Sequence, residues 1–403
     1  MQAPPVIVIG LGGIGSATLA ALARRGVRVL GLDRLHPPHQ QGSSHGGSRI
    51  IRAAYFEHPD YVPLAREAFH GWERLESETG RRCLHRCGVL LVGGPNSEVL
   101  RESRSAAVRH GIQTDEIDRG DLLRRWPMFD VPRDHRGLYE PDAGIVVPET
   151  GIEAHLEVAR RHGADIRTGM KVESIEDDGD QVRVTCHGAR LEASRVIVTV
   201  GAWTRGLLPE LASVSLEPQR KAIVWCRAVE GREQDVDSAR MPAWLIDDEA
   251  RNGDGAYYGI PSHPGQIGPT GVKIGFHGPG LPVDPDDLGG EPGPEVQVRF
   301  HREVSGHFPG LFATPHAASS CLYTMSTDQH FVIDRLPGRP RVVVAAGFSG
   351  HGYKFAPALG ERIADLGLGG DVPRDVDFLG LSRFSGSQPP LSGRSGVGRP
   401  GRE

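Results

Sequence analysis

The hydrophobic pattern at the start of the chain predicts a strand, a turn and a helix. Residues 6–9 are a continuous run of Val and Ile, which is typical of a parallel strand buried on both faces. Residues 14–25 are rich in Ala and Leu and are followed by Gly26, which predicts a helix that ends there. A second apolar run over residues 28–32 predicts another strand, and this strand leads into Asp33. The chain therefore opens with the strand–helix–strand unit of a parallel sheet.

Further along the chain, the pattern predicts two kinds of sheet. The β-branched run over residues 195–200 ends at Gly201, which indicates a return to the parallel sheet. Between residues 221 and 277, short alternating segments are separated by loops rich in Pro and Gly, which predicts an antiparallel sheet in a second domain. The predicted helices are residues 63–79, 98–110, 121–126 and 151–162. The remaining predicted strands are residues 88–92, 165–168, 171–175, 181–187, 221–227, 256–259, 271–277 and 342–346.

Three glycines follow the first predicted strand with the Gly-x-Gly-x-x-Gly spacing of dinucleotide-binding turns. Gly10 allows a tight turn, Gly12 lets the backbone approach a pyrophosphate, and Gly15 lets the helix pack on the strand. Asp33 follows the second strand, where a carboxylate can accept hydrogen bonds from an adenosine ribose. A glycine-rich turn without a ligand is the alternative, but the strand, the helix and the acidic residue together favour a dinucleotide site. Either NAD or FAD fits Asp33.

Length and charge restrict the class of protein. At 403 residues the chain exceeds the usual size of a single hydrophobic core, so we expect two domains. The net charge is −5, with 46 basic and 51 acidic residues, which gives no signal for nucleic acid or an anionic membrane. No apolar stretch is long enough to span a bilayer, so we expect a cytoplasmic protein that works on small molecules. We also expect a monomer. Cys83 and Cys87 have no partner cluster with zinc-like spacing, so no metal site is expected.

Lysine is scarce in this chain, which draws attention to the positions that keep it. The sequence has four lysines, at Lys171, Lys221, Lys273 and Lys354, against 42 arginines. Where Arg serves the ordinary basic roles, a retained Lys marks a position that can use a compact ammonium or an adjustable pKa. Lys273 alternates with apolar neighbours in its predicted strand, so its side chain should point away from the buried face, towards solvent or towards a pocket.

Two further segments carry candidate chemistry. The loop over residues 37–52 is rich in small residues, so its backbone can run close to a flat ligand. It ends in Arg49 and Arg52, which can bind a carboxylate; a solvated surface loop is the alternative. Residues 347–355 form a glycine-rich turn after a buried strand, and a helix start predicted at residues 349–354 would direct a second helix N-terminus at a ligand.

These motifs together resemble a known family of flavoenzymes. From about residue 6 to residue 384, the chain is similar to the monomeric sarcosine oxidase and N-methyltryptophan oxidase family, FAD-dependent enzymes of the D-amino acid oxidase fold. The similarity is carried by residues 10–15, 42–52, 257–259, 273–277, 321–324 and 347–355.

The resemblance implies roles for individual residues. It implies that Cys321 holds the flavin covalently through a thioether to its 8α-methyl group. It also implies that Arg52 and Lys354 bind the substrate carboxylate, and that Tyr258 and His277 line the amine end of the pocket.

For the flavin ring, the resemblance implies that Arg49 and Lys273 face it, with Lys273 similar to the oxygen-activating lysine of the family. A positive charge at that position would stabilise the superoxide that forms when oxygen is reduced. The expected FAD contacts are Gly10, Gly12, Gly15, Asp33, Ser43, Arg49, Val172, Cys321, Gly347, Gly350, Gly352 and Lys354.

The resemblance implies a mixed α/β (α+β) fold with two domains. A Rossmann-like FAD-binding domain would comprise residues 1–84, 145–217 and 322–384. A substrate domain built on an antiparallel sheet would comprise residues 85–144 and 218–321. Residues 385–403, which are mainly Gly, Ser, Pro and Arg, are predicted to be a disordered tail.

The implied reaction is oxidation of the C–N bond of an N-methyl or secondary α-amino acid, with O2 as acceptor and H2O2 as product. A pipecolate-type oxidase of cyclic imino acids and a flavin-binding protein without turnover are the alternatives. An NAD-dependent dehydrogenase would fit residues 10–33 but would leave Cys321 unexplained. The chain departs from the family pattern at residues 44–45 and 47–48 and has a longer segment between Tyr258 and Lys273, which bears on the choice of substrate.

Overall fold

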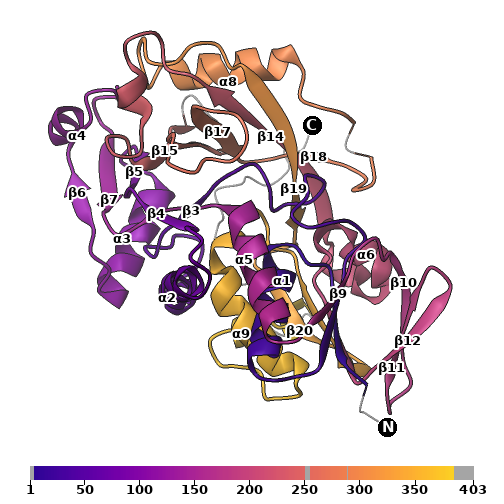
Figure 1. Cartoon of the computed structure of the whole chain (residues 1–403). Helices are drawn as coiled ribbons and strands as arrows, with labels where there is room; N and C mark the ends of the chain where they lie inside the picture. Colours follow the sequence, from indigo (N-terminus) through magenta and orange to yellow (C-terminus); the bar gives the residue numbers. More distant parts are fainter. Residues whose placement is uncertain (1–3, 250–254, 288, 385–403) are drawn as a thin grey trace.

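The computed structural model describes residues 4–249, 255–287 and 289–384 (Figure 1). The predicted disordered tail at residues 385–403 lies outside this part of the chain. No helix within the described residues has the length and apolar character needed to cross a bilayer.

A six-stranded sheet forms the first of two sheet-centred regions. Its strands run in the order β20, β21, β13, β1, β2 and β9, and every neighbouring pair is parallel except β20 with β21. Their bounds are Val332–Leu336, Arg339–Ala346, Arg195–Val198, Val6–Ile9, Val29–Leu32 and Asp165–Arg167. The predicted strand–helix–strand opening and the predicted return to the parallel sheet are therefore confirmed.

The two faces of this sheet pack against different layers, because alternate residues of a strand point to opposite faces. Val6 and Val8 belong to a core shared with a layer of four helices that contact one another (Figure 1). These helices are α1 (Gly13–Arg24), α2 (Tyr61–Thr79), α5 (Pro148–Arg161) and α9 (Ala356–Gly367). Ile7 and Ile9 belong to the core on the other face, which includes a small antiparallel sheet. That sheet is formed by β10 (Val172–Asp177), β11 (Val182–Cys186) and β12 (Ala189–Ala193).

A nine-stranded sheet forms the second region. Along its main path the strands are β18 (Leu281–Pro282), β14 (Glu217–Cys226), β17 (Val272–His277), β16 (Ala256–Ile260), β15 (Ala243–Asp247), β5 (Val89–Gly93), β7 (Arg136–Glu140) and β6 (Asp115–Ile117), and β19 (Ala317–Met325) also pairs with β14. Its pairs are antiparallel except that of β5 with β15, which is parallel. The two parallel strands come from distant parts of the chain, so local alternation could not reveal their relative direction.

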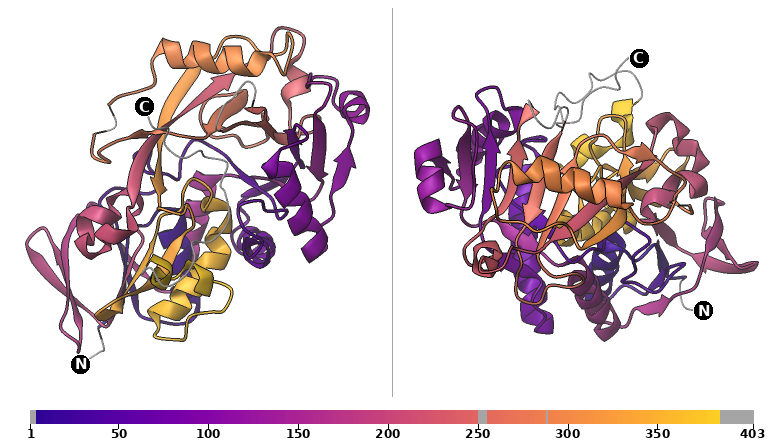
Figure 2. Two further views of the ribbon diagram at one scale, coloured as in Figure 1. Left: turned by 180° about the vertical axis from the view of Figure 1, so that it is seen from behind. Right: turned by 90° about the horizontal axis from the view of Figure 1, so that it is seen from above.

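The nine-stranded sheet also has two different faces. Leu90, Trp244 and Ile274 pack into a core with Phe300 of α8 (Pro294–Ser305), the helix that covers this sheet in both views of Figure 2. The adjacent residues of the same strands, such as Leu91, point to the opposite face. That opposite face carries Tyr258, one of the residues with candidate chemistry.

Further elements lie outside these two sheets. A three-stranded sheet joins β3 (Arg49–Ile51), β8 (Gly144–Val146) and β4 (Leu84–Arg86). The remaining helices are α3 (Glu98–His110), α4 (Arg119–Arg125), α6 (Thr204–Leu207) and the 3-10 turns η1 (Gly201–Trp203), η2 (Pro209–Val214), η3 (Glu233–Val236), η4 (Tyr353–Phe355), η5 (Asp377–Leu379) and η6 (Leu381–Phe384). The residue boundaries given above for the two domains stay a prediction.

Candidate active site

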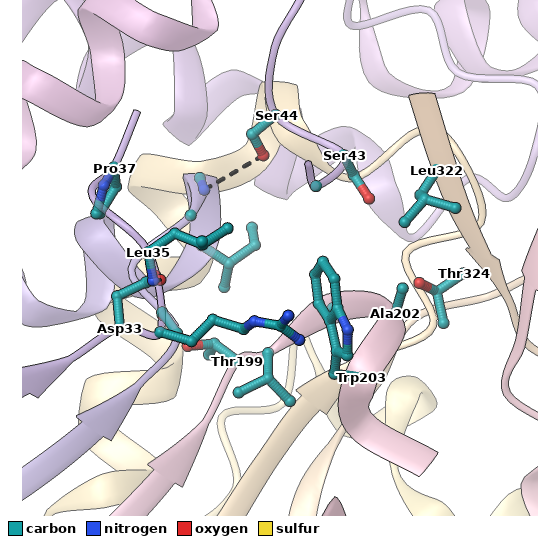
Figure 3. A pocket seen from close by; sticks show the side chains of 18 of the residues that line it. Asp33, Leu35, Pro37, Ser43, Ser44, Thr199, Ala202, Trp203, Leu322 and Thr324 are labelled. Carbon is teal, nitrogen blue, oxygen red and sulfur yellow. Dashed lines mark hydrogen bonds between the residues drawn. The ribbon is translucent and has the colours of Figure 1, made fainter. Parts of the chain in front are cut away.

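A cavity of about 540 Å³ lies at the carboxyl ends of three neighbouring parallel strands. Gly10, Asp33 and Thr199 follow β1, β2 and β13, respectively, and all three line the cavity. Figure 3 shows Asp33, Thr199 and Trp203 around this space, with Ser43 and Ser44 on the opposite side. Ligands of open parallel sheets bind at this edge of the sheet, so the cavity is the expected dinucleotide site.

The glycine-rich turn has the geometry that its spacing predicts. Gly10 has a φ of +87°, and a Cβ atom there would lie 2.7 Å from the carbonyl oxygen of Thr199. A Cβ atom on Gly15 would overlap the carbonyl oxygen of Gly10, so this glycine allows α1 to pack on the turn. Gly12 lines the cavity, and the nearest atom to a Cβ there would be Ser44 Oγ at 4.0 Å. Gly10 and Gly15 thus pack tightly against protein atoms, whereas Gly12 leaves room for a ligand in the cavity.

Asp33 is fixed by the backbone around it. Its Oδ2 atom accepts a hydrogen bond from the Leu11 N–H at 2.7 Å, and its Oδ1 atom accepts one from the Leu35 N–H at 2.8 Å. The side chain is 5% exposed and lines the cavity, so it can still receive hydrogen bonds from a bound ribose.

Two residues that sequence reasoning missed meet at the rim of this cavity. The Arg34 guanidinium lies 4.8 Å from the centre of the Trp203 ring and forms an ion pair with Asp286 at 2.7 Å. Trp203 Nε1 also donates a hydrogen bond to Asp286 at 2.8 Å. Arg34 could have been suspected from its place next to Asp33, but no motif indicates Asp286, which comes from the segment between β18 and α8.

A second, smaller cavity of about 90 Å³ adjoins the first. Arg49 and Tyr323 line both cavities, so they lie at the junction. Five residues predicted to be catalytic or substrate-binding come together here. They are Arg49, Arg52, Tyr258, His277 and Lys354.

Arg52 is held by an acidic partner that the sequence did not reveal. Its Nη2 atom lies 2.9 Å from Oε2 of Glu57, and both side chains are 5% exposed. The guanidinium also lies 4.6 Å and 4.3 Å from the ring centres of Tyr55 and Phe56. Although burial opposes it, the charge of Arg52 lowers the pKa of Glu57 to about 2. The pair is therefore ionised at neutral pH.

Lys354 is buried beside this pair. Its Nζ atom donates hydrogen bonds to the Tyr55 hydroxyl at 3.2 Å and to the carbonyl oxygen of His351 at 2.9 Å. Burial lowers the pKa of Lys354 to about 7; the Glu57 carboxylate opposes this shift, and the charge of Arg52 adds to it. Lys354 is therefore present in both its charged and its neutral form near pH 7, unless a further anion binds beside it.

Tyr258 and His277 form another part of the second cavity. Burial raises the pKa of Tyr258 to about 12 and lowers that of His277 to about 4, so both side chains are uncharged at pH 7. The Tyr258 ring lies across Gly275 of the neighbouring strand, and a Cβ atom at Gly275 would overlap the ring. Sequence reasoning missed this requirement because a glycine inside a strand gives no indication of which side chain crosses it.

Lys273 is buried, at 2% exposure, rather than solvated. As predicted, its side chain points away from the apolar core of its strand, but the loop at residues 46–48 covers this face. Lys273 Nζ donates hydrogen bonds to the carbonyl oxygens of Gly46, at 3.1 Å, and Ser48. Its own atoms line neither of the two cavities. The neighbouring Arg49 donates to the carbonyl oxygens of Ser43 and Ser48, so both cations fix the same loop.

Cys321 is also buried, at 3% exposure, in strand β19. It pairs across the strands with Lys221 of β14, and the next residue, Leu322, lines the large cavity. Burial raises the pKa of Cys321, while the charges of Arg49, Lys273 and Lys221 oppose this shift. Cys321 therefore directly precedes a residue that lines the large cavity, and three cationic side chains are near enough to influence its thiol.

Comparison with known proteins shows the family. The family profile described as FAD dependent oxidoreductase (DAO) matches residues 5–366. The chain belongs to this family. The dinucleotide that the sequence motif left open between NAD and FAD is therefore FAD.

Three similar proteins are named as oxidases. A monomeric sarcosine oxidase from Bacillus sp. (strain B-0618) is 35% identical over 383 residues, which is 94% of this chain and 95% of that protein. An N-methyl-L-tryptophan oxidase from Salmonella dublin is 35% identical over 388 residues, covering 94% and 99% of the two chains. A single-substitution variant of NikD, an unusual amino acid oxidase essential for nikkomycin biosynthesis, superposes with a TM-score of 0.82 at 25% identity, covering 94% of this chain and 97% of that chain.

The large cavity fits FAD in several respects. Among the residues expected to contact FAD, Gly10, Gly12, Asp33, Ser43, Arg49, Val172, Gly350 and Gly352 line it. Gly15 and Gly347 do not line it, since both pack against neighbouring protein atoms. The N-cap residue of α1, Gly12, has no side chain to cap the helix, but Ser44 Oγ, which lines the cavity, accepts a hydrogen bond from the Gly13 N–H at 3.3 Å. A bound pyrophosphate would replace this contact or use the neighbouring N–H groups of the first turn.

The glycine-rich turn after β21 differs from the prediction in one detail. The helix begins with η4 at Tyr353 and not at residue 349. Gly347, Ser349 and Gly350 have φ angles of +62°, +46° and +83°, and this left-handed backbone cannot continue a right-handed helix. Gly350 lines both cavities, so the turn still lies where the flavin-binding and substrate-binding spaces meet.

Two departures from the family pattern are in direct contact. Gly47 has a φ of +76°, and a Cβ atom there would overlap the carbonyl oxygen of Ile267. Ile267 belongs to the longer segment between Tyr258 and Lys273. The lengthened segment therefore packs on the loop over Lys273, at a position where only glycine leaves enough room.

Proposed function

We propose that this FAD-dependent oxidoreductase oxidises the C–N bond of N-methyl or other secondary α-amino acids, with O2 as acceptor and H2O2 as product. The observation that carries the proposal is the charge of the second cavity, which is lined by Arg49, Arg52 and Lys354 but by a single carboxylate, Glu57. Buried cations in excess need an anion, and the carboxylate of an amino acid would supply it. The sarcosine and N-methyl-L-tryptophan oxidases among its relatives support the same reaction class.

Each side chain of the second cavity has a function in this proposal. When bound, FAD would accept the hydride equivalent and pass the electrons to oxygen. Arg52 and Lys354 would bind the carboxylate and so orient the C–N bond towards the junction with the large cavity, where Arg49 lies. Tyr258 keeps its hydroxyl proton and can donate a hydrogen bond, while neutral His277 does not repel the substrate amine. The expected partners are the amino acid and O2; a monomeric, cytoplasmic protein stays a prediction.

The reaction class can be tested by peroxide release from the holoenzyme. We expect peroxide with secondary α-amino acids such as sarcosine and pipecolate, and anaerobic bleaching of the flavin by the same compounds. Below about pH 7 Lys354 is charged, and as the pH rises through this value the ammonium loses its proton. The KM for the acid should therefore rise above about pH 7 in wild type but not in Lys354→Gln. Bound flavin without bleaching by any secondary amino acid would favour the alternative of a non-catalytic flavin-binding protein.

We further propose that FAD is covalently bound through Cys321. The proposal is supported by the burial of this thiol next to residues that line the large cavity and by the cations that oppose the rise of its pKa. A thiolate is the nucleophilic form of cysteine, so nearby positive charge favours bond formation. The new C–S bond would replace a C–H bond of the 8α-methyl group, which would lose a proton; the flavin would take up the two electrons, and O2, the acceptor of the proposed reaction, would reoxidise it.

Acid precipitation tests this covalent bond. We expect the yellow chromophore to stay with the precipitated wild-type protein and to appear in the supernatant of Cys321→Ser. Cys226→Ser is the matched control, because Cys226 is also buried but packs into the core on the opposite face of the sheet, and it should keep the chromophore. Release of all flavin from the wild type would show that the cofactor is not covalently bound.

A further inference from the structure

The second cavity has an apolar wall in addition to its charged residues. Val89 and Leu91 of β5, Leu245 of β15 and Ile260 of β16 line it, and each is at most 8% exposed. None of these side chains has a polar atom. The polar groups of the cavity come instead from the segment around Arg52, from Tyr258, Tyr323 and His277, and from the turn that precedes α9.

The wall is part of the sheet and therefore has a defined shape. Leu91 pairs with Leu245 across β5 and β15, and Leu245 pairs with Tyr258 across β15 and β16. These three side chains thus form one row on one face. Leu90 and Trp244, each preceding a member of this row, point into the core on the opposite face. A row fixed by strand register cannot easily turn to present other groups to a ligand.

The wall restricts the chemistry of the substrate group that contacts it. The Tyr258 hydroxyl is the one polar group of this row, so a charged substituent beside Leu91 and Leu245 would lose its hydration without gaining a charged partner, which is unfavourable. The one carboxylate of the cavity, Glu57, is already paired with Arg52. An aliphatic substituent, in contrast, would gain by burying apolar surface against the wall.

The size of the cavity sets a second restriction. Its volume is about 90 Å³. A dry cavity of about 150 Å³ is known to hold a benzene ring. Because Arg49 and Tyr323 line both cavities, this space opens into the large cavity, and only part of a substrate lies in it. The part beside the wall is limited to a few aliphatic carbons, since an indole ring is larger than benzene.

We infer that the preferred substrates are secondary α-amino acids whose side chain is a short aliphatic chain or a saturated ring. This inference rests on the proposed function, because the Arg52 and Lys354 end must hold the carboxylate for the α-substituent to reach the wall. Sarcosine has no substituent and would leave the wall without a contact. N-methyltryptophan would exceed the cavity, and an N-methylated acidic amino acid would place a second carboxylate against apolar side chains.

A substrate series tests the inference on the unaltered holoenzyme. Anaerobic flavin bleaching is followed in rapid mixing with sarcosine, N-methyl-L-alanine, N-methyl-L-valine, L-pipecolate, N-methyl-L-aspartate and N-methyl-L-tryptophan. We expect the second-order rate constant for N-methylvaline or pipecolate to exceed that for sarcosine by about tenfold or more, the effect of one or two methylene groups in an apolar pocket. Equal or faster bleaching by sarcosine, N-methylaspartate or N-methyltryptophan would overturn the inference but leave the proposed function intact. If no compound bleaches the flavin, the proposed function itself fails.

Two neighbouring leucines provide matched variants. Leu91→Ala enlarges the cavity at the wall, whereas Leu90→Ala removes the same group from the core on the other face of the same strand. Leu91→Ala should shift the preference by about tenfold towards longer side chains such as that of N-methylleucine, while Leu90→Ala should keep the wild-type order. The same shift in both variants would show that general loosening of the fold, and not the wall, sets the preference.

Discussion

Replacing Arg52 by Gln should raise the KM for an N-methyl amino acid by about 10- to 150-fold and leave the KM for the corresponding amide almost unchanged. The expected factor follows from the roughly 1.5–3 kcal/mol that a hydrogen bond to a charged group contributes. The substrate carboxylate would share the guanidinium with Glu57, which lies 2.9 Å from it in the present structure. Steady-state kinetics with the acid and its amide measure the effect directly.

The ion pair itself calls for a control. Loss of Arg52 alone leaves Glu57 buried without its partner, and breaking a buried pair in this way typically costs about 3–5 kcal/mol of folding free energy. The variant Arg52→Gln with Glu57→Gln removes both charges. If the KM effect reports carboxylate binding, it should persist in the double variant while thermal stability recovers. An equal loss of activity on the acid and the amide would instead assign Arg52 a structural role.

The parts of the fold that could be predicted from the sequence are those that residues close together in the chain determine. The continuous apolar run of β1 and the glycine spacing after it determine a strand and a turn almost without regard to the rest of the chain. Gly10 shows this clearly, since its positive φ is a property of the turn that the spacing implies. The same reasoning located the turn after β21, although the left-handed residues Ser349 and Gly350 delay the helix beyond the predicted start.

Contacts between distant segments could not be predicted in this way. Asp286 meets Arg34 although the two are far apart in the chain, and nothing in the local sequence of either residue indicates the other. Glu57 is separated from Arg52 by only a few residues, but an acidic residue in a loop has no distinctive pattern. Gly275 matters because a tyrosine from the next strand crosses it, which requires the strand register.

Lys273 illustrates a prediction that the structure refines without testing its function. Alternation in the strand correctly placed its side chain opposite the apolar core, but the sequence could not show that the loop at residues 46–48 covers it. Burial lowers the pKa of Lys273 well below its usual value, the charge of Arg49 adds to this shift, and Glu149 opposes it. The ammonium is therefore lost at a lower pH than that of an exposed lysine, and any reaction step that needs its charge should become slower as the pH rises.

The proposal that Lys273 activates oxygen gives the largest expected effect. Reduction of oxygen builds an anion, so a fixed positive charge lowers the barrier, and removing such a group typically costs about 10²- to 10³-fold in rate. In rapid-mixing experiments, Lys273→Met should slow reoxidation of the reduced protein by this factor and hardly change anaerobic reduction by the amino acid. The reoxidation rate should fall with rising pH in the wild type but not in Lys273→Met. Lys221→Met is the comparison variant, because Lys221 is also a buried lysine that lines neither cavity. Since Lys221 lies across the strands from Cys321, both variants are compared on their flavin-loaded fraction, and loaded Lys221→Met should reoxidise at close to the wild-type rate. If Lys273→Met slows reduction and not reoxidation, the residue supports substrate binding through the loop that carries Arg49, and its assignment to oxygen is wrong.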